Sequence, residues 1–246
     1  MESPSTTAIG SDAGPTVALQ QMHMFRVCER TGNAIDVRMG RPSQSVDLSA
    51  LAKVPAWPLA RVLALPGRCR GGLMTDWAEH VRRRYGEAEP DRMRAALGLT
   101  RVELPDQPEK EGWYPVGFQL GLTRVLVDRH LGGDILKLEA LIHEDARRKQ
   151  QGVGAKVARW LLTPRRLMSA AEKVYPHVYD IGAVDADVQK HIATFRWSGG
   201  AFMEEPIWRV LQVFAVRGLF DALGEPEPEI RASEPGGDRF ELVVRY

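Results

Sequence analysis

The histidines are the residues most able to bind a metal ion, and their spacing argues against a metal site. The chain of 246 residues has six of them: His23, His80, His130, His143, His177 and His191. His143 opens the stretch HEDAR, so the fourth following residue is Arg147 where a zinc-protease helix has a second histidine. A zinc site needs three or four converging ligands. The sequence therefore predicts no metal site and places His143 on a solvated helix face.

Other catalytic signatures are also missing from the sequence. Gly152 and Gly154 are one residue apart and Lys156 is followed by valine, whereas a P-loop has four residues between its glycines and then Lys-Ser or Lys-Thr. No Gly-x-Ser-x-Gly pattern occurs, and Cys28 and Cys69 lack a flanking pattern for thiol catalysis. We therefore expect no catalytic residues and a protein that is not an enzyme.

One stretch gathers the residues that could form a ligand site. In residues 189–199, QKHIATFRWSG, every second residue falls on one face of a predicted strand, which gives that face His191, Ala193, Phe195 and Trp197. Aromatic rings on such a face either fill the protein's own core or line an apolar cavity between a sheet and helices. The residue pattern leaves both interpretations open.

Composition and charge exclude several classes of partner. Lys and Arg total 33 against 32 for Asp and Glu, so no overall field attracts nucleic acid or an anionic membrane. No apolar run reaches the ~18 residues of a membrane span. Residues 1–15 lack the pattern of a signal peptide and are expected to form a disordered tail. The cytoplasm is the expected compartment.

Periodicity along the chain predicts an α+β fold, in which a helical middle packs on a small, mostly antiparallel C-terminal sheet. Residues 16–60 are expected to form an N-terminal β-hairpin, turning at Thr31-Gly32-Asn33, and a connector. A domain over 61–246 follows. Helical patterns occupy 73–86, 114–133, 134–152, 153–162 and 163–178, and a hairpin, a helix and a second hairpin follow at 179–197, 207–223 and 227–246.

The helix predicted over 207–223 has an unusually broad apolar face. Its polar residues form a narrow stripe about four residues apart: Arg209, Gln212, Arg217 and Asp221. A surface helix normally has a narrower apolar face. We therefore expect this helix to be buried on most sides, against the sheet and against helices or a second subunit.

The order of features over 113–246 resembles a known superfamily. The matching features are the helical run through Gly121 and Gly133-Asp134, the segment TPRRLMSAAEKVYPHVYDIG, the strand IATFRW followed by SGG, the helix ending in RGLFDALG, and the terminal GGDRFELVVRY. This order is similar to that of the 4-vinyl reductase-like domain and of its relatives, the haem-nitric-oxide-binding (H-NOX) domain and the Bet3-type trafficking subunits. Within the superfamily it resembles an uncharacterised group that is rich in paralogues in myxobacteria.

The resemblance implies a place for a ligand but not a haem. In haem-binding relatives the ligand lies between sheet and helices, so resemblance of placement adds Tyr179 and Trp208 to His191, Phe195 and Trp197 as candidate ligand-binding residues. Haem-binding H-NOX domains carry a Tyr-x-Ser-x-Arg motif for the haem propionates, and this sequence has no such motif. The terminal hairpin also lacks the cysteines that 4-vinyl reductase-like domains often carry. We therefore expect no cofactor.

Two functions remain open at this point. The first is a non-catalytic sensory or regulatory module, in which a small apolar ligand between sheet and helices shifts the 207–223 helix or a dimer contact. The second is a dimeric interaction or scaffold protein with a filled core and no ligand. Bet3-type relatives dimerise through helices, so the resemblance implies a homodimer in either case, with a protein partner as a further candidate.

Overall fold

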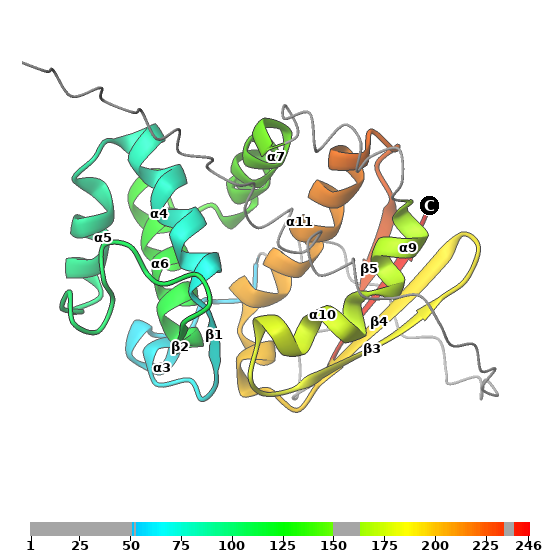
Figure 1. Cartoon of the computed structure of the whole chain (residues 1–246), viewed down its shortest axis with the longest axis horizontal. Coiled ribbons are helices and arrows are strands. Elements are labelled where there is room, and N and C mark those ends of the chain that lie inside the picture. Colours follow the sequence, from blue (N-terminus) through cyan, green and yellow to red (C-terminus); the bar gives the residue numbers. More distant parts are fainter. Residues whose placement is uncertain (1–50, 52, 150–162, 234–238) are drawn as a thin grey trace, which may run out of the picture.

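The computed structural model describes residues 51, 53–149, 163–233 and 239–246. In Figure 1 helices α4 to α6 gather at one side, the larger sheet lies at the other, and α11 runs between them. The α-helices are α3 (Leu59–Leu63), α4 (Gly71–Tyr85), α5 (Glu89–Ala96), α6 (Val116–His130), α7 (Leu138–Lys149), α9 (Pro164–Ser169), α10 (Ala171–Val178) and α11 (Pro206–Leu223). Two 3-10 turns are η2 (Ile135–Lys137) and η3 (Ala201–Glu204). This arrangement confirms the predicted α+β class.

The larger sheet is antiparallel throughout. Its strands are β3 (Ala183–Val188), β4 (Ile192–Ser198), β5 (Glu229–Ala232) and β6 (Arg239–Arg245), in the order β3-β4-β6-β5. On β4 and β6 buried residues alternate with more exposed ones. The register sets Trp197 opposite Phe240 and Phe195 opposite Leu242, so the buried faces of the two strands meet.

Helix α11 is the central helix, as its broad apolar face predicted. Its first residue, Pro206, follows Glu205, whose side chain accepts a hydrogen bond from the backbone N–H of Trp208 and so caps the helix. Gly224 ends the helix in the left-handed conformation, with φ 74°, which glycine adopts without steric cost. The helix packs against α6, α7, α9 and η3. Trp208 of α11 also contacts Trp197 of β4 and Phe240 of β6, so the helix reaches both the helical part and the sheet part of the fold.

A second, two-stranded sheet was not predicted. Strands β1 (Arg68–Arg70) and β2 (Trp113–Pro115) pair antiparallel over a long separation in the chain. A bridge from Cys69 to Tyr179 continues this pairing toward the C-terminal part. The carboxylate of Asp180 then accepts hydrogen bonds from the backbone N–H and the side-chain Nε of Arg68, at 2.6 and 2.7 Å. These contacts tie the start of α4 to the end of α10.

Several predicted boundaries agree with the structure. Thr163 caps α9 with Pro164 as its first residue, and Asp134 accepts a hydrogen bond from the backbone N–H of Leu136. The predicted tail at 1–15 and the hairpin around 31–33 lie outside the described residues. In the described part of the chain, no helix is long and apolar enough to cross a membrane.

Candidate functional site

The predicted strand face is buried except at its first member. Ala193, Phe195 and Trp197 of β4 are buried, as the alternation predicted. His191 is exposed and precedes the strand, with its Nδ1 3.1 Å from the backbone oxygen of Tyr246. His191 is therefore not part of the buried group of rings. It lies in the bend that precedes β4, at the exposed end of the sheet, where its backbone oxygen accepts a hydrogen bond from the N–H of Tyr246 at 3.0 Å.

The remaining predicted site residues meet in one buried group of rings. Trp208 of α11 lies at its centre and has no exposed surface. Ring centroids of its neighbours lie 5.5 to 6.4 Å away, all in edge contact. These separations and angles are those of aromatic rings in contact. We call this group the aromatic cluster: Tyr179, Trp197, Phe202, Trp208 and Phe240.

The cluster extends beyond the residues that the sequence indicated. Phe195 stacks at a tilt on Trp197, with centroids 5.6 Å apart, and so joins the edge of the cluster. Phe202 and Phe240 were not predicted as site residues, although both are buried and contact Trp208 directly. The alternation of the terminal DRFELVVRY segment places Phe240 on a buried face. Nothing local in the sequence indicates that Phe202, in the short turn η3, contacts the same indole.

Two ionisable groups, Tyr179 within the cluster and Cys69 beside it, have pKa values raised by burial. Burial raises the pKa of the Cys69 thiol to about 12. Burial also raises the pKa of the Tyr179 phenol well above its usual range, and the nearby Cys69 adds to the shift. A protonated thiol is neither a nucleophile nor a metal ligand. The cluster therefore brings rings together without bringing reactive groups to them.

Two charged residues are buried at the start of α11, and sequence reasoning placed neither in a site. Burial raises the pKa of Glu205 to about 7, against backbone hydrogen bonds from Trp208 and Ile207 that lower it. Oε1 of Glu205 has no hydrogen-bond partner within the described residues. Arg209 donates from its Nε to the backbone oxygen of Met203 at 2.6 Å, and its guanidinium lies 5.2 Å from the ring centroid of Phe240. Burial lowers the pKa of Arg209.

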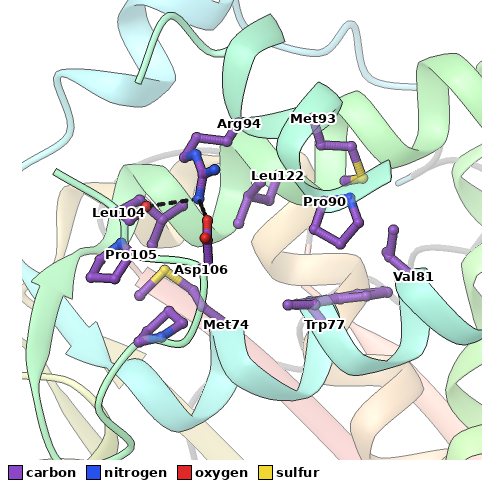
Figure 2. A pocket seen from close by; sticks show the side chains of 12 residues that line it. Met74, Trp77, Val81, Pro90, Met93, Arg94, Leu104, Pro105, Asp106 and Leu122 are labelled. Atoms are coloured by element: carbon purple, nitrogen blue, oxygen red, sulfur yellow. Dashed lines mark hydrogen bonds and ion pairs between the residues drawn. The ribbon is translucent and has the colours of Figure 1, made fainter. Parts of the chain in front are cut away.

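A hollow lies in the helical part of the molecule, away from the aromatic cluster. Figure 2 shows this pocket between α4 and α5, with the segment 104–108 along one side. Its volume is about 30 Å³, and we call it the α4–α5 pocket. The lining residues are Met74, Trp77, Ala78, Val81, Pro90, Met93, Arg94, Leu104, Pro105, Asp106, Pro108 and Leu122. The prediction of an apolar cavity between sheet and helices therefore did not indicate this position.

Arg94 is the buried cation at the edge of the pocket, and its guanidinium is fully engaged. It donates to the carboxylate of Asp106 at 2.6 Å, to the backbone oxygen of Leu104 at 3.1 Å and to the carboxylate of Asp91 at 2.5 Å. Figure 2 shows the first two contacts as dashed lines. Arg94 also lowers the pKa of Asp106, against a smaller opposing effect of burial. Arg94 thus holds the 104–108 segment against α5.

Glu89 fixes α5 to α6 from the other side. Its carboxylate accepts hydrogen bonds from Arg129 and His130, both at 2.8 Å, and from Arg92 at 3.2 Å. Burial would raise the pKa of Glu89, but the hydrogen bonds from these three partners outweigh burial and lower it to about 2. The imidazole of His130 is stacked on Tyr85, with ring centroids 3.9 Å apart. The helices around the pocket are therefore joined by ionic contacts.

Comparisons with known proteins place the fold. No family model matches the sequence, and no curated protein matches it. The H-NOX protein from K. algicida, solved in its Fe(II) unliganded form, is similar over 72% of this chain and 95% of its own, with a TM-score of 0.52 and 12% identity. A structure from a study of haem redox potential and porphyrin distortion covers the same share of this chain and 99% of its own, with a TM-score of 0.52 and 10% identity. The chain therefore has an H-NOX-like fold.

The rings of the aromatic cluster leave no slot for a haem among themselves. A porphyrin needs an open slot, and an axial ligand such as histidine, thiolate or tyrosine. The rings of Tyr179, Trp197 and Trp208 contact one another or their neighbours, so no slot separates them. His191 is exposed, and Cys69 keeps its proton. In the described part of the chain, no group of three or more His, Cys, Asp or Glu residues could hold a metal ion.

Proposed function

We propose that this protein is a non-catalytic sensory or regulatory module with an H-NOX-like fold that works without haem. The observation that carries the proposal is the aromatic cluster, because its rings occupy the space in which a ligand was expected. Trp208 and Phe202 have no exposed surface, and Trp208 contacts four rings. Side chains in contact on every side leave no position for a flat cofactor.

The sensory part of the proposal depends on the fold and on α11. Three of the neighbours in structure are named as H-NOX proteins, and two structures come from work on haem or porphyrin distortion. In this chain α11 packs against α6, α7, α9 and η3. A shift of α11 would therefore change contacts in both the helical part and the sheet part of the molecule. We propose that a small apolar ligand, bound elsewhere than in the aromatic cluster, supplies the signal.

A second candidate is a dimeric interaction or scaffold protein without a ligand. The filled core also favours this second candidate, because a protein that acts through its surface needs no internal ligand site. For this candidate we infer the function from the resemblance to Bet3-type subunits, to 4-vinyl reductase-like domains and to the paralogue-rich myxobacterial group. A homodimer with a further protein partner, in the cytoplasm, is the form we propose for it.

Haem supply during expression tests the first proposal. The full chain would be expressed with a haem precursor, passed through a size-exclusion column and measured by absorption spectroscopy. The H-NOX protein from K. algicida, treated in the same way, is the positive control. We expect no Soret band in this protein, because the cluster leaves no slot. A Soret band at one haem per chain after chromatography would overturn the proposal.

Light scattering on the same column tests the second candidate, whose function needs a stable pair. A dimer at micromolar concentration agrees with both candidates. A monomer overturns the homodimer and leaves the ligand-responsive module as the function to pursue.

A further inference from the structure

We propose that the α4–α5 pocket is the binding site for a small, neutral, apolar molecule. This inference rests on the proposed function, to which it adds a ligand class and a place. It moves the site away from the aromatic cluster and into the helical part. Three features carry it: the lining, the bonding of the rim and the size.

The inner surface of the pocket is apolar and adaptable. Met74, Trp77 and Val81 of α4 face Met93 of α5, and Leu122 of α6 closes the space between them. Methionine side chains are flexible and polarisable, so they adjust to ligands of different shape. Pockets that bind small molecules are lined mostly by such apolar and aromatic groups. The lining therefore selects an apolar ligand.

The polar groups at the rim are occupied and do not recruit a charged ligand. Arg94 already bonds to two carboxylates and a backbone oxygen. An anion would have to displace Asp106, whose contact with Arg94 is 2.6 Å long. Arg101 adds a second contact to the same carboxylate at 3.3 Å. A neutral molecule meets no such competition.

The segment over the pocket is held from both helices. From α4, Thr75 donates to the backbone oxygen of Pro108 at 2.9 Å, and Arg82 donates to the backbone oxygen of Asp106 at 2.8 Å. From α5, Arg94 holds Leu104 and Asp106. A site that is already in its bound shape spends less free energy on ordering when ligand enters. The 104–108 segment is thus a preformed wall of the pocket.

The size of the pocket limits the ligand. A volume of about 30 Å³ exceeds the ~10–15 Å³ that a single water needs, but is well below the ~150 Å³ cavity that holds benzene. A diatomic gas or a one-carbon molecule matches this size, and a larger occupant such as xenon needs the flexible methionine side chains to move aside. Leu122 lies on α6, and α6 packs on the central helix α11. A ligand in the pocket would therefore push on α6 and, through α6, on α11.

Xenon is the probe for this site, because it enters apolar cavities and carries no charge. The full chain, labelled with ¹³C at its methionine methyl groups, would be titrated with xenon and followed by NMR. We expect saturable shifts of the Met74 and Met93 methyl signals. Met203, which is buried at η3 near the aromatic cluster, serves as the internal control and should not shift.

Matched variants locate the binding. Ala78→Leu extends a side chain into the pocket from α4, whereas Ala95→Leu adds the same group at an exposed position of α5. We expect A78L to reduce the xenon shifts at least fivefold and A95L to leave them unchanged. If A78L does not fold, Val81→Ile adds one methyl group to the same wall and should weaken the shifts about twofold.

Two results would overturn the proposal that the α4–α5 pocket binds an apolar molecule. One is the absence of saturable shifts at Met74 and Met93. The other is equal shifts in A78L and A95L, with both variants folded by circular dichroism. The proposed haem-free function has a separate readout, the Soret band, so either proposal can fail while the other stands.

Discussion

The aromatic cluster and the α4–α5 pocket show two ways of building the space between elements. The cluster joins sheet and α11 through ring contacts around Trp208, which has no exposed surface. The pocket lies between helices that are joined by Glu89, Arg94 and Asp106 through hydrogen bonds and ion pairs. One region is filled and held by apolar burial. The other is hollow and held by charge at its rim.

The difference has consequences for stability and response. Close-packed side chains resist changes of shape, because each atom removed or moved loses many contacts. The charged contacts around the pocket each include a more exposed partner, such as Asp91, Arg92 or Asp106, and such contacts contribute less free energy and weaken with salt. The cluster should therefore determine how stable the protein is. The pocket should determine where it can respond.

The largest expected effect comes from Trp208→Ala. Removing a buried tryptophan leaves a cavity, and such changes cost about 3–5 kcal/mol in free energy of unfolding. Trp77→Ala, in the half-buried wall of the pocket, should cost less than half as much. Urea unfolding of both variants, with an unchanged m-value, measures the contrast. Equal losses would mean that the two regions are packed alike.

Glu205 gives the next largest effect, and it depends on pH. Burial raises the folded-state pKa from 4.5 to about 7, so the folded protein holds a proton between these values that the unfolded chain has released. Stability should therefore fall as pH rises from about 4.5 to about 7, by about 1–3 kcal/mol. Glu205→Gln should remove this part of the slope.

The control for Glu205 is its neighbour Glu204, which is only half-buried. Glu204→Gln makes the same change of charge and should keep the wild-type slope. Unfolding free energies at several pH values, compared between the two variants, give the result. Identical slopes would show that Glu205 does not titrate in this window.

Glu89 gives the smallest of the three effects, with the opposite dependence on pH. Its pKa is lowered from 4.5 to about 2 in the folded state, so its contribution is complete above 4.5 and is lost as pH falls toward 2. Because Arg92 and Arg129 are largely exposed, we expect Glu89→Gln to cost only about 1–2 kcal/mol at neutral pH. The fully exposed neighbour supplies the control, Glu87→Gln. A loss in E89Q that is no larger than in E87Q contradicts the account.

Local patterns in the sequence predicted the elements that follow a simple period. The alternation in IATFRW gave the buried face of β4, and the broad apolar face of 207–223 gave the central helix. The start of the helix at 163 and the end of the helix at 223 were equally predictable, because Thr163, Pro164 and Gly224 determine them within one turn. His191 is exposed at the end of that face, because a period of two does not show where the buried part of a strand begins.

Contacts between distant parts of the chain could not be predicted in this way. The pairing of β1 with β2 and the bridge from Cys69 to Tyr179 join segments far apart in sequence. The sequence pattern around Arg94 is that of a solvated helix residue, but in the fold the 104–108 segment packs against it. The α4–α5 pocket depends on three helices and that segment together. The periodicity of any one of these segments does not show that a hollow lies between them.

The contrast between the filled aromatic cluster and the hollow α4–α5 pocket is tested most directly by a crystal structure of the full chain under xenon pressure. Xenon occupies apolar hollows and scatters anomalously. The account predicts an anomalous peak beneath the 104–108 segment, between Met74 and Met93, and none among the rings around Trp208. A peak within the aromatic cluster, or none in the α4–α5 pocket, would contradict it.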